Sequence, residues 1–276
     1  MNAAGAASLL SVVISLPIST DACAQSSPWR LGVALGDGLR SNPLIQSEDV
    51  PVAVDIDIAW FGERFFFDNF DAGYTMIDSD AVTVNVVGRV NSDRVFFSKT
   101  DTEFVQVSAA IGQATSFVPG LALAQPTELT VPDRDYAVEL GFEVLAEGRF
   151  GQLQLAAHHD ASGTHGGYEI FVDYGYRWRR QRWSIASSVG FAYKSAELND
   201  YYWGVRADEA NAALPAYQAG AGLNPHLELA VSYQLTRHWS VAITAQYERL
   251  ATAAAASPIV AERNVVGRFA GVRYRF

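Results

Sequence analysis

The sequence predicts an all-β fold, a transmembrane antiparallel up-and-down β-barrel of about twelve strands, with ten strands as the alternative. Apolar and polar residues alternate with a period of two over most of the chain, as they do in strands with two different faces. Hydrophobic residues make up 49% of the chain and charged residues only 18%. The apolar residues are nevertheless dispersed, and beyond the N-terminus no stretch reaches the ~20 consecutive apolar residues that a membrane helix needs.

The alternation is clearest in two segments of the C-terminal part. Residues 227–235 carry apolar side chains at every odd position, and 239–247 repeat the pattern after a short turn at 236–238. Aromatic rings gather near the ends of such segments, where the headgroup level of a bilayer favours them; they are Trp60, Trp178, Trp183, Tyr193, Trp239 and Tyr247. Amphipathic segments of ~10 residues with aromatic ends are typical of membrane barrels.

The predicted strands alternate between short turns and longer connections. They lie near residues 30–40, 50–60, 63–76, 80–92, 100–113, 134–146, 149–160, 167–178, 182–194, 222–235, 238–250 and 265–276. Bacterial barrels have short periplasmic turns and longer outer loops. The last strand therefore runs from the outside to the periplasm. The segment 100–113 alternates least, and we keep it because an even number of strands leaves the start of the barrel in the periplasm.

The first 24 residues resemble a secretory signal peptide. A short apolar core at 9–18 precedes Ala22-Cys23-Ala24, a small-x-small cleavage site, although no Lys or Arg comes before the core. Cleavage after Ala24 would remove Cys23, the one cysteine of the chain. We therefore expect a signal peptide over 1–24 and a single barrel domain over 25–276, without disulfides.

Charge and motifs exclude several classes of function. The formal net charge of −10 argues against a nucleic-acid partner, because such surfaces are basic. His158, His159, Asp160 and His165 surround one outer loop, but no known ligand spacing relates them, so we expect a solvated strand end and no metal. A G-x-S-x-G nucleophile elbow does not occur in the sequence. We expect neither a cofactor nor enzymatic activity.

Charged residues occupy the positions that the alternation directs into the lumen. The acidic ones are Asp55, Asp57, Glu139, Glu143, Glu169, Asp173, Glu228 and Glu248, and they face Arg89, Arg177, Arg273 and Arg275. A ring of acids favours cations, so one interpretation is a weakly cation-selective pore. Small barrels are usually filled by their own side chains, which favours the other interpretation, a plug of ion pairs.

The C-terminal segment carries a candidate assembly signal. Val272, Tyr274 and Phe276 alternate on one face and end on an aromatic residue. Assembly factors can bind such an edge by adding a strand to it. We therefore expect the barrel-assembly machinery as one partner.

The same C-terminal quarter supports a family resemblance. It contains Tyr202-Trp203-Gly204-Val205, the run ANAALPAY at 210–217 and the final Gly271-Val272-Arg273-Tyr274-Arg275-Phe276. Nearer the N-terminus are a glycine-rich first strand at 31–38 and the aromatic run 65–67. In this order the chain resembles the MltA-interacting protein (MipA)/OmpV family of Gram-negative outer-membrane proteins.

The resemblance implies a small multi-pass barrel in the outer membrane, surrounded by outer-membrane lipid. One family member is a scaffold that links a murein transglycosylase to a murein synthase, and others are porin-like. The family has no catalytic residues to transfer. We expect a structural role in which the turns at 179–182 and 236–238, or the barrel rim, dock peptidoglycan-remodelling enzymes. The alternatives are a narrow porin-like channel for small solutes or cations, and a lipid-modifying or hydrolytic barrel.

Overall fold

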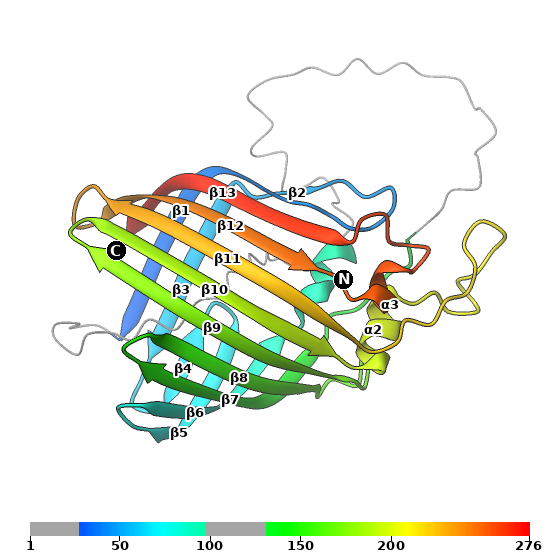
Figure 1. Cartoon of the computed structure of the whole chain (residues 1–276), viewed down its shortest axis with the longest axis horizontal. Coiled ribbons are helices and arrows are strands. Elements are labelled where there is room, and N and C mark those ends of the chain that lie inside the picture. Colours follow the sequence, from blue (N-terminus) through cyan, green and yellow to red (C-terminus); the bar gives the residue numbers. More distant parts are fainter. Residues whose placement is uncertain (1–27, 98–130) are drawn as a thin grey trace, which may run out of the picture.

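The computed structural model describes residues 28–97 and 131–276. Within these ranges the chain forms one antiparallel sheet that curves into a barrel (Figure 1). Its strands are β1 (Trp29–Arg40), β2 (Val50–Pro51), β3 (Val54–Phe61), β4 (Phe65–Asp68), β5 (Asp71–Asp78), β6 (Val82–Val90), β7 (Val138–Gly148), β8 (Gly151–Asp160), β9 (Tyr168–Arg180), β10 (Trp183–Lys194), β11 (Gly222–Gln234), β12 (Trp239–Arg249) and β13 (Asn264–Arg275). Its helices are η1 (Ser92–Phe97), α2 (Ala196–Trp203) and α3 (Thr252–Ala255).

The barrel is closed by its first and last long strands. β13 pairs with β1 from Gly32↔Arg275 to Arg40↔Gly267. The sheet has thirteen strands, and β2 is a two-residue strand beside the end of β1, so twelve strands form the ring. The prediction of a twelve-stranded antiparallel barrel is confirmed. This pairing gives the first and last long strands a hydrogen-bonded partner, as a membrane requires of a sheet.

One predicted strand is wrong in detail. Residues 63–76 form two short strands, β4 and β5, that turn back at Asn69 and Phe70 with φ of 47° and 83°. Asn tolerates this left-handed region better than most residues, and Asn69 is also tied to β3. Its N–H donates to the carbonyl of Ile58 at 2.9 Å, and its side-chain oxygen accepts from the Ile58 N–H at 3.0 Å.

The predicted strand at 100–113 lies outside the described residues. β6 pairs directly with β7 from Val82↔Ala146 to Val90↔Val138, so the ring closes without that segment. The extra strand at β4–β5 compensates for it, and the count stays at twelve.

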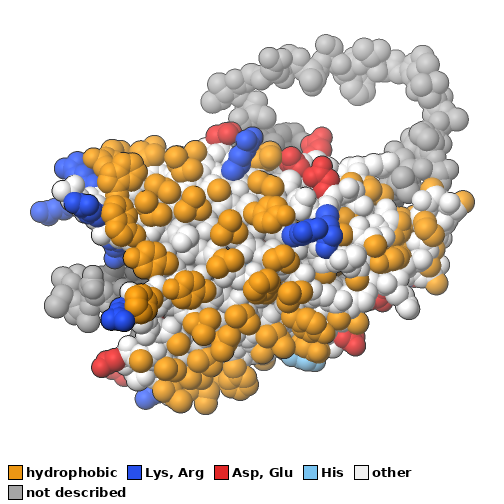
Figure 2. All heavy atoms as spheres, viewed as in Figure 1, with side chains coloured by type: hydrophobic (Ala, Val, Ile, Leu, Met, Phe, Trp, Pro, Cys, Tyr) orange, Lys and Arg blue, Asp and Glu red, His pale blue; other side chains and the backbone are white. Residues whose placement is uncertain are grey.

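The outer surface of the barrel is an apolar band (Figure 2). Outward residues such as Leu35, Phe142 and Ile243 are more than half exposed, at 61%, 58% and 54%. Aromatic rings pair at the ends of neighbouring strands, with 4.8 Å between the centroids of Trp183 and Tyr233. These pairs match the aromatic belts of membrane barrels. No helix among residues 28–97 and 131–276 is long and apolar enough to span a membrane.

The two ends of the barrel differ. The connections β3–β4, β5–β6, β7–β8, β9–β10 and β11–β12 are short and lie at the end where β13 finishes, which we call the periplasmic end. The long connections at the outer end carry η1, α2 and α3 (Figure 1). α2 begins after Ser195, whose side chain accepts a hydrogen bond from the Leu198 N–H as an N-cap.

Candidate functional site

The candidate site is the lumen. It contains a cavity of about 760 Å³ that extends from the periplasmic turns at Glu63 and Asp80 to Arg40 and Lys194 near the outer end. Pockets of this size suit small ligands. Six of the predicted lumen charges line it, namely Arg89, Glu143, Glu169, Asp173, Glu228 and Glu248.

A continuous chain of ion pairs lies in the outer part of the lumen, along the arc of strands from β6 to β10. Arg89 on β6 bonds Glu139 on β7 at 2.9 Å and also Glu169 on β9. Lys194 on β10 bonds Asp93 of η1 at 2.7 Å and lies 3.7 Å from Glu169. Both partners of the Lys194–Asp93 pair are more than 95% buried in their side chains, at 3% and 4% exposure. The chain therefore links four strands on one side of the wall, β6, β7, β9 and β10, and fixes η1 against them.

The middle of the lumen holds acids with polar neighbours. Asp173 and His226 share a hydrogen bond, and Glu248 accepts from the Asn224 side chain at 2.8 Å. Glu228 is only 7% exposed, and its Oε2 has no hydrogen-bond partner among the described residues. Glu143 accepts hydrogen bonds from Asn85 on β6 and Gln154 on β8.

The periplasmic part of the lumen contains the remaining predicted charges. Arg273 on β13 bonds Asp55 on β3 at 2.8 Å. Asp57, also on β3, bonds Arg30 on β1 at 3.0 Å. Arg275 alternates with the outward Tyr274 and points into the mouth, where it is exposed. All twelve predicted lumen residues, Arg89 and Arg177 included, thus lie on the inner face, and their functional role stays a prediction.

A hydrophobic cap covers the outer end. Trp203, Tyr202 and Leu198 of α2 are fully buried against Phe96 and Phe97 of η1. Further members of this cluster are Leu44, Val205, Leu214, Ala219, Leu250, Ala254, Ile259 and Val265. Every long outer connection that the structure describes, except the 161–167 loop, contributes to the cluster.

An ion pair supports the cap. The buried Arg134 guanidinium donates to both oxygens of Glu209, at 2.6 and 3.0 Å, and to the carbonyl of Gly204. Burial opposes ionisation of Glu209, but the hydrogen bonds from Arg134 and from the Arg206 N–H outweigh it and hold the pKa of Glu209 below its usual value. Bidentate pairs of this kind are among the strong hydrogen bonds of proteins.

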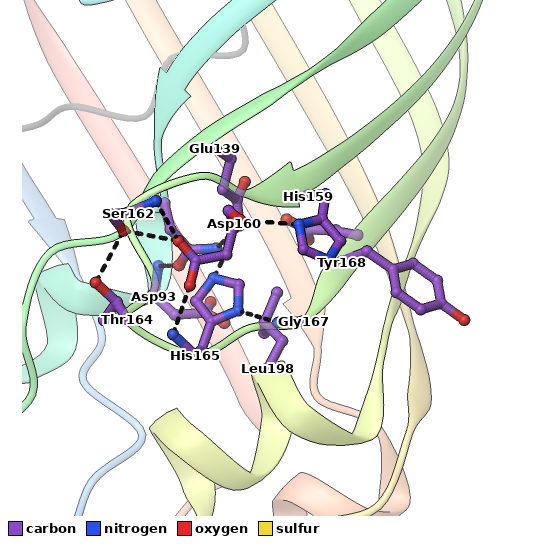
Figure 3. A network of polar contacts seen from close by, with 12 residues as sticks. Asp93, Glu139, His159, Asp160, Ser162, Thr164, His165, Gly167, Tyr168 and Leu198 are labelled. Carbon is purple, nitrogen blue, oxygen red and sulfur yellow. Dashed lines mark hydrogen bonds and ion pairs between the residues drawn. The ribbon is translucent and has the colours of Figure 1, made fainter.

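The residues weighed as metal ligands do not converge. His158 points into the lumen and His159 to the outside, because neighbouring residues of a strand face opposite sides. Asp160 uses its oxygens for the loop that follows, accepting from the N–H groups of Ser162, Gly163, His165 and Gly166 (Figure 3). No group of three metal-binding side chains occurs within the described ranges. Asp160 therefore organises the 161–167 turn.

The candidate assembly residues lie on the lipid-facing side of β13. Val272 is 41% exposed and Phe276 is 74% exposed. Tyr274 lies between Trp239 and Phe276, with ring centroids 4.8 and 4.9 Å away. This placement suits an ordinary closing strand as well as a recognition signal, so the assembly role stays a prediction.

Sequence reasoning missed the residues that close the lumen. The alternation could have identified Lys194 as an inward residue, because it follows the outward Tyr193 in a predicted strand. Asp93 and Arg134 lie in loops, where no periodicity tells which side chains turn inward. Only their contacts identify them.

Comparisons with known proteins agree with this architecture. The family model of MltA-interacting protein MipA matches residues 33–276. The MltA-interacting protein of Escherichia coli (strain K12) is 22% identical over 269 residues, which cover 96% of this chain and 98% of that protein. Outer membrane protein OmpV of Vibrio cholerae is 31% identical over 145 residues, or 52% of this chain and 56% of OmpV.

Solved structures resemble the chain more distantly. A FadL homologue of Pseudomonas aeruginosa aligns with a TM-score of 0.38 and 8% identity, over 90% of this chain and 87% of that one. A loop-deletion mutant of OmpT from Vibrio cholerae aligns with a TM-score of 0.33 and 7% identity, over 91% and 100% of the two chains. At these scores neither structure bears on function. The family match and the closed barrel together place this chain in the outer membrane as a member of the MltA-interacting protein MipA family.

Proposed function

We propose that this barrel is a scaffold that docks peptidoglycan-remodelling enzymes, a murein transglycosylase and a murein synthase, at its periplasmic end. The observation that carries the proposal is the closed outer half of the lumen. The Asp93–Lys194–Glu169–Arg89–Glu139 chain of ion pairs and the hydrophobic cap occupy the route that a solute would take. A barrel closed to the outside is suited to acting through its periplasmic surface.

The turns at that surface offer the contacts. Arg180 and Arg182 flank Gln181 in the β9–β10 turn, and Arg237 and His238 lie in the β11–β12 turn. All five side chains are exposed. Arginine is enriched at protein interfaces and at the residues that dominate binding energy. The E. coli relative is named for its interaction with MltA, which supports a periplasmic murein enzyme as the partner.

Affinity capture tests the docking role. The detergent-purified full chain, immobilised, is expected to retain a murein transglycosylase from a periplasmic extract of the same bacterium. A variant with Arg180→Ser, Arg182→Ser and Arg237→Ser is expected to lose it. Arg249→Ser at the outer end of β12 is the matched control and is expected to retain it. Equal retention by all three proteins, or no murein enzyme on the intact barrel, would contradict the proposal.

A narrow channel is the second candidate, because the cavity of about 760 Å³ is lined by acids and begins at the periplasmic turns. Planar-bilayer conductance separates the two candidates. The scaffold proposal predicts no channel events for the intact chain. Steady cation-selective conductance, abolished by Glu228→Gln, would favour the channel.

A further inference from the structure

The periplasmic mouth of the lumen carries a cluster of guanidinium groups. Arg177 and Arg179 of β9 and Arg273 and Arg275 of β13 occupy inward positions, and Arg30 of β1 is the fifth member. Arg275 is within electrostatic range of Asp57 as well as of Arg273, Arg30 and Arg179, and Arg177 is within range of Arg179, Arg30 and Glu147. The five groups therefore lie at one mouth, on β1, β9 and β13.

The acids at the mouth neutralise only part of this cluster. Arg273 is paired with Asp55, and Arg30 is paired with Asp57 and Asp68. Arg179 and Arg275 form no ion pair with an acidic side chain of residues 28–97 and 131–276, and both are exposed. Like charges held close together repel one another unless an anion lies between them.

The wall between the two groups of arginines is built mostly from small residues. On β10, β11 and β12 the inward positions near the mouth are Ser184, Ala186, Ala230, Ser232, Gln234, Ser240 and Ala242. The strand register aligns Arg179 with Ser184, Ser184 with Ser232, Ser232 with Ala242, and Ser240 with Arg273. Hydroxyl donors thus lie beside the arginines of β9, at Ser184, and beside those of β13, at Ser240.

The cluster is accessible from the periplasm and not from the bilayer. The outward faces of the same strands carry Trp178, Trp183, Trp239 and Tyr274, which form the aromatic belt. Figure 2 shows Lys and Arg side chains gathered at this end of the barrel, where the C-terminus lies in Figure 1. The chain as a whole has a formal charge of −10, so this mouth is a local positive region on an acidic protein.

We propose that the mouth is a binding site for a multiply charged oxyanion, held by Arg179, Arg275 and their neighbouring guanidiniums with Ser184, Ser232 and Ser240 as additional donors. Guanidinium presents planar pairs of N–H groups that match phosphate and carboxylate oxygens. Several of them converging on one place suit a group with two or more negative charges, such as a pyrophosphate or a polycarboxylate. This site is additional to the proposed docking role, because its ligand is bound inside the mouth.

Calorimetric titration of the detergent-purified full chain tests the site. Pyrophosphate and citrate are titrated separately at low ionic strength, so that a phosphate ligand is distinguished from a carboxylate one. At least one of them is expected to bind with a stoichiometry of one, and added NaCl is expected to weaken the binding.

Variants locate the binding. Arg179→Gln together with Arg275→Gln is expected to weaken it about tenfold or more, since hydrogen bonds to charged groups are lost. Ser232→Leu fills the space without changing the charge and is expected to weaken it as well. Arg249→Gln, at the outer end of β12, is the matched control and is expected to bind normally. Folding of each variant is checked by comparing the electrophoretic mobility of unheated and heated samples, which differs for a folded barrel.

The proposal is overturned if neither anion binds, or if the double variant binds as the intact chain does. Binding of a synthetic poly-glutamate peptide without binding of either small anion would also overturn it, in favour of an acidic protein segment. Because no murein enzyme is present, failure here leaves the capture experiment on the docking role unaffected.

Discussion

At the scale of single residues, the buried ion pairs are where we expect a substitution to cost most. Lys194 and Asp93 are shielded from water and join β10 to η1 at 2.7 Å. Removing one partner of a buried pair leaves an uncompensated charge, which costs far more than the pair itself contributes. The structure therefore depends on the pair mainly because burying either charge without the other would destabilise the fold.

Lys194→Met is expected to lower the free energy of unfolding by roughly 3–5 kcal/mol, because Asp93 stays buried without its partner. Urea unfolding of the barrel in lipid vesicles, followed by tryptophan fluorescence, measures this loss. Lys194→Met combined with Asp93→Asn should recover much of the stability. An unchanged midpoint in the single variant would show that η1 does not depend on this pair.

At the scale of elements, β4 and β5 depend on one tight turn. Asn69 has a φ of 47° and forms two hydrogen bonds with the backbone of Ile58 on β3. Its own N–H donates one, and its side-chain oxygen accepts the other. The aromatic run 65–67 looks like the start of one long strand, and the turn interrupts it. The alternation correctly predicted strand structure here. A single Asn was not a strong enough indication of a turn to predict that residues 63–76 form two strands.

Asn69→Val and Asn69→Gly separate the two contributions of this residue. Both variants lose the side-chain hydrogen bond, but only Val is strained at positive φ. Val is therefore expected to be less stable than Gly by about 1–3 kcal/mol. The measurement is again urea unfolding in vesicles. Equal stabilities of the two variants would mean that the turn relaxes around the substitution.

The closing strand β13 allows a second test at this scale. Deleting Phe276 removes the terminal ring that contacts Tyr274, and it shortens the edge by which an assembly factor would add a strand. The amount of barrel in purified outer membranes is expected to fall, while Phe276→Tyr keeps the ring and should insert normally. Normal insertion of the deleted chain would leave β13 as an ordinary closing strand.

For the whole molecule, the lumen is layered along its axis. A guanidinium-rich mouth leads into an acid-lined cavity, then into the buried ion pairs and finally into the hydrophobic cap. The order explains why a barrel of twelve strands need not be open. The cap contains the loops of the outer end, so its opening can be followed by cleavage within those loops.

The cap is expected to open at acidic pH. The folded protein holds the pKa of Glu209 below its unfolded value, so this pair stabilises the cap above the unfolded pKa, and the contribution is lost as pH falls through the folded pKa. Pepsin cleavage between 205 and 217, relative to cleavage elsewhere, should increase as the pH is lowered through this range. Glu209→Gln should already be cleaved there at the upper end of the acidic range and change little as the pH falls. A flat profile for the intact chain would show that Arg134–Glu209 does not control the cap.

The sequence by itself determined the fold class and the side of each strand that faces the lumen, whereas its count of twelve strands agreed because 63–76 forms two strands and the ring closes without 100–113. These follow from a period of two, which is a local property of the chain and is imposed by lipid on one face. Only the tertiary structure decided where 63–76 divides, that β6 pairs with β7, and that Asp93, Lys194 and Arg134 close the outer end. These depend on contacts between residues far apart in sequence, and loop residues carry no periodicity from which such contacts can be read.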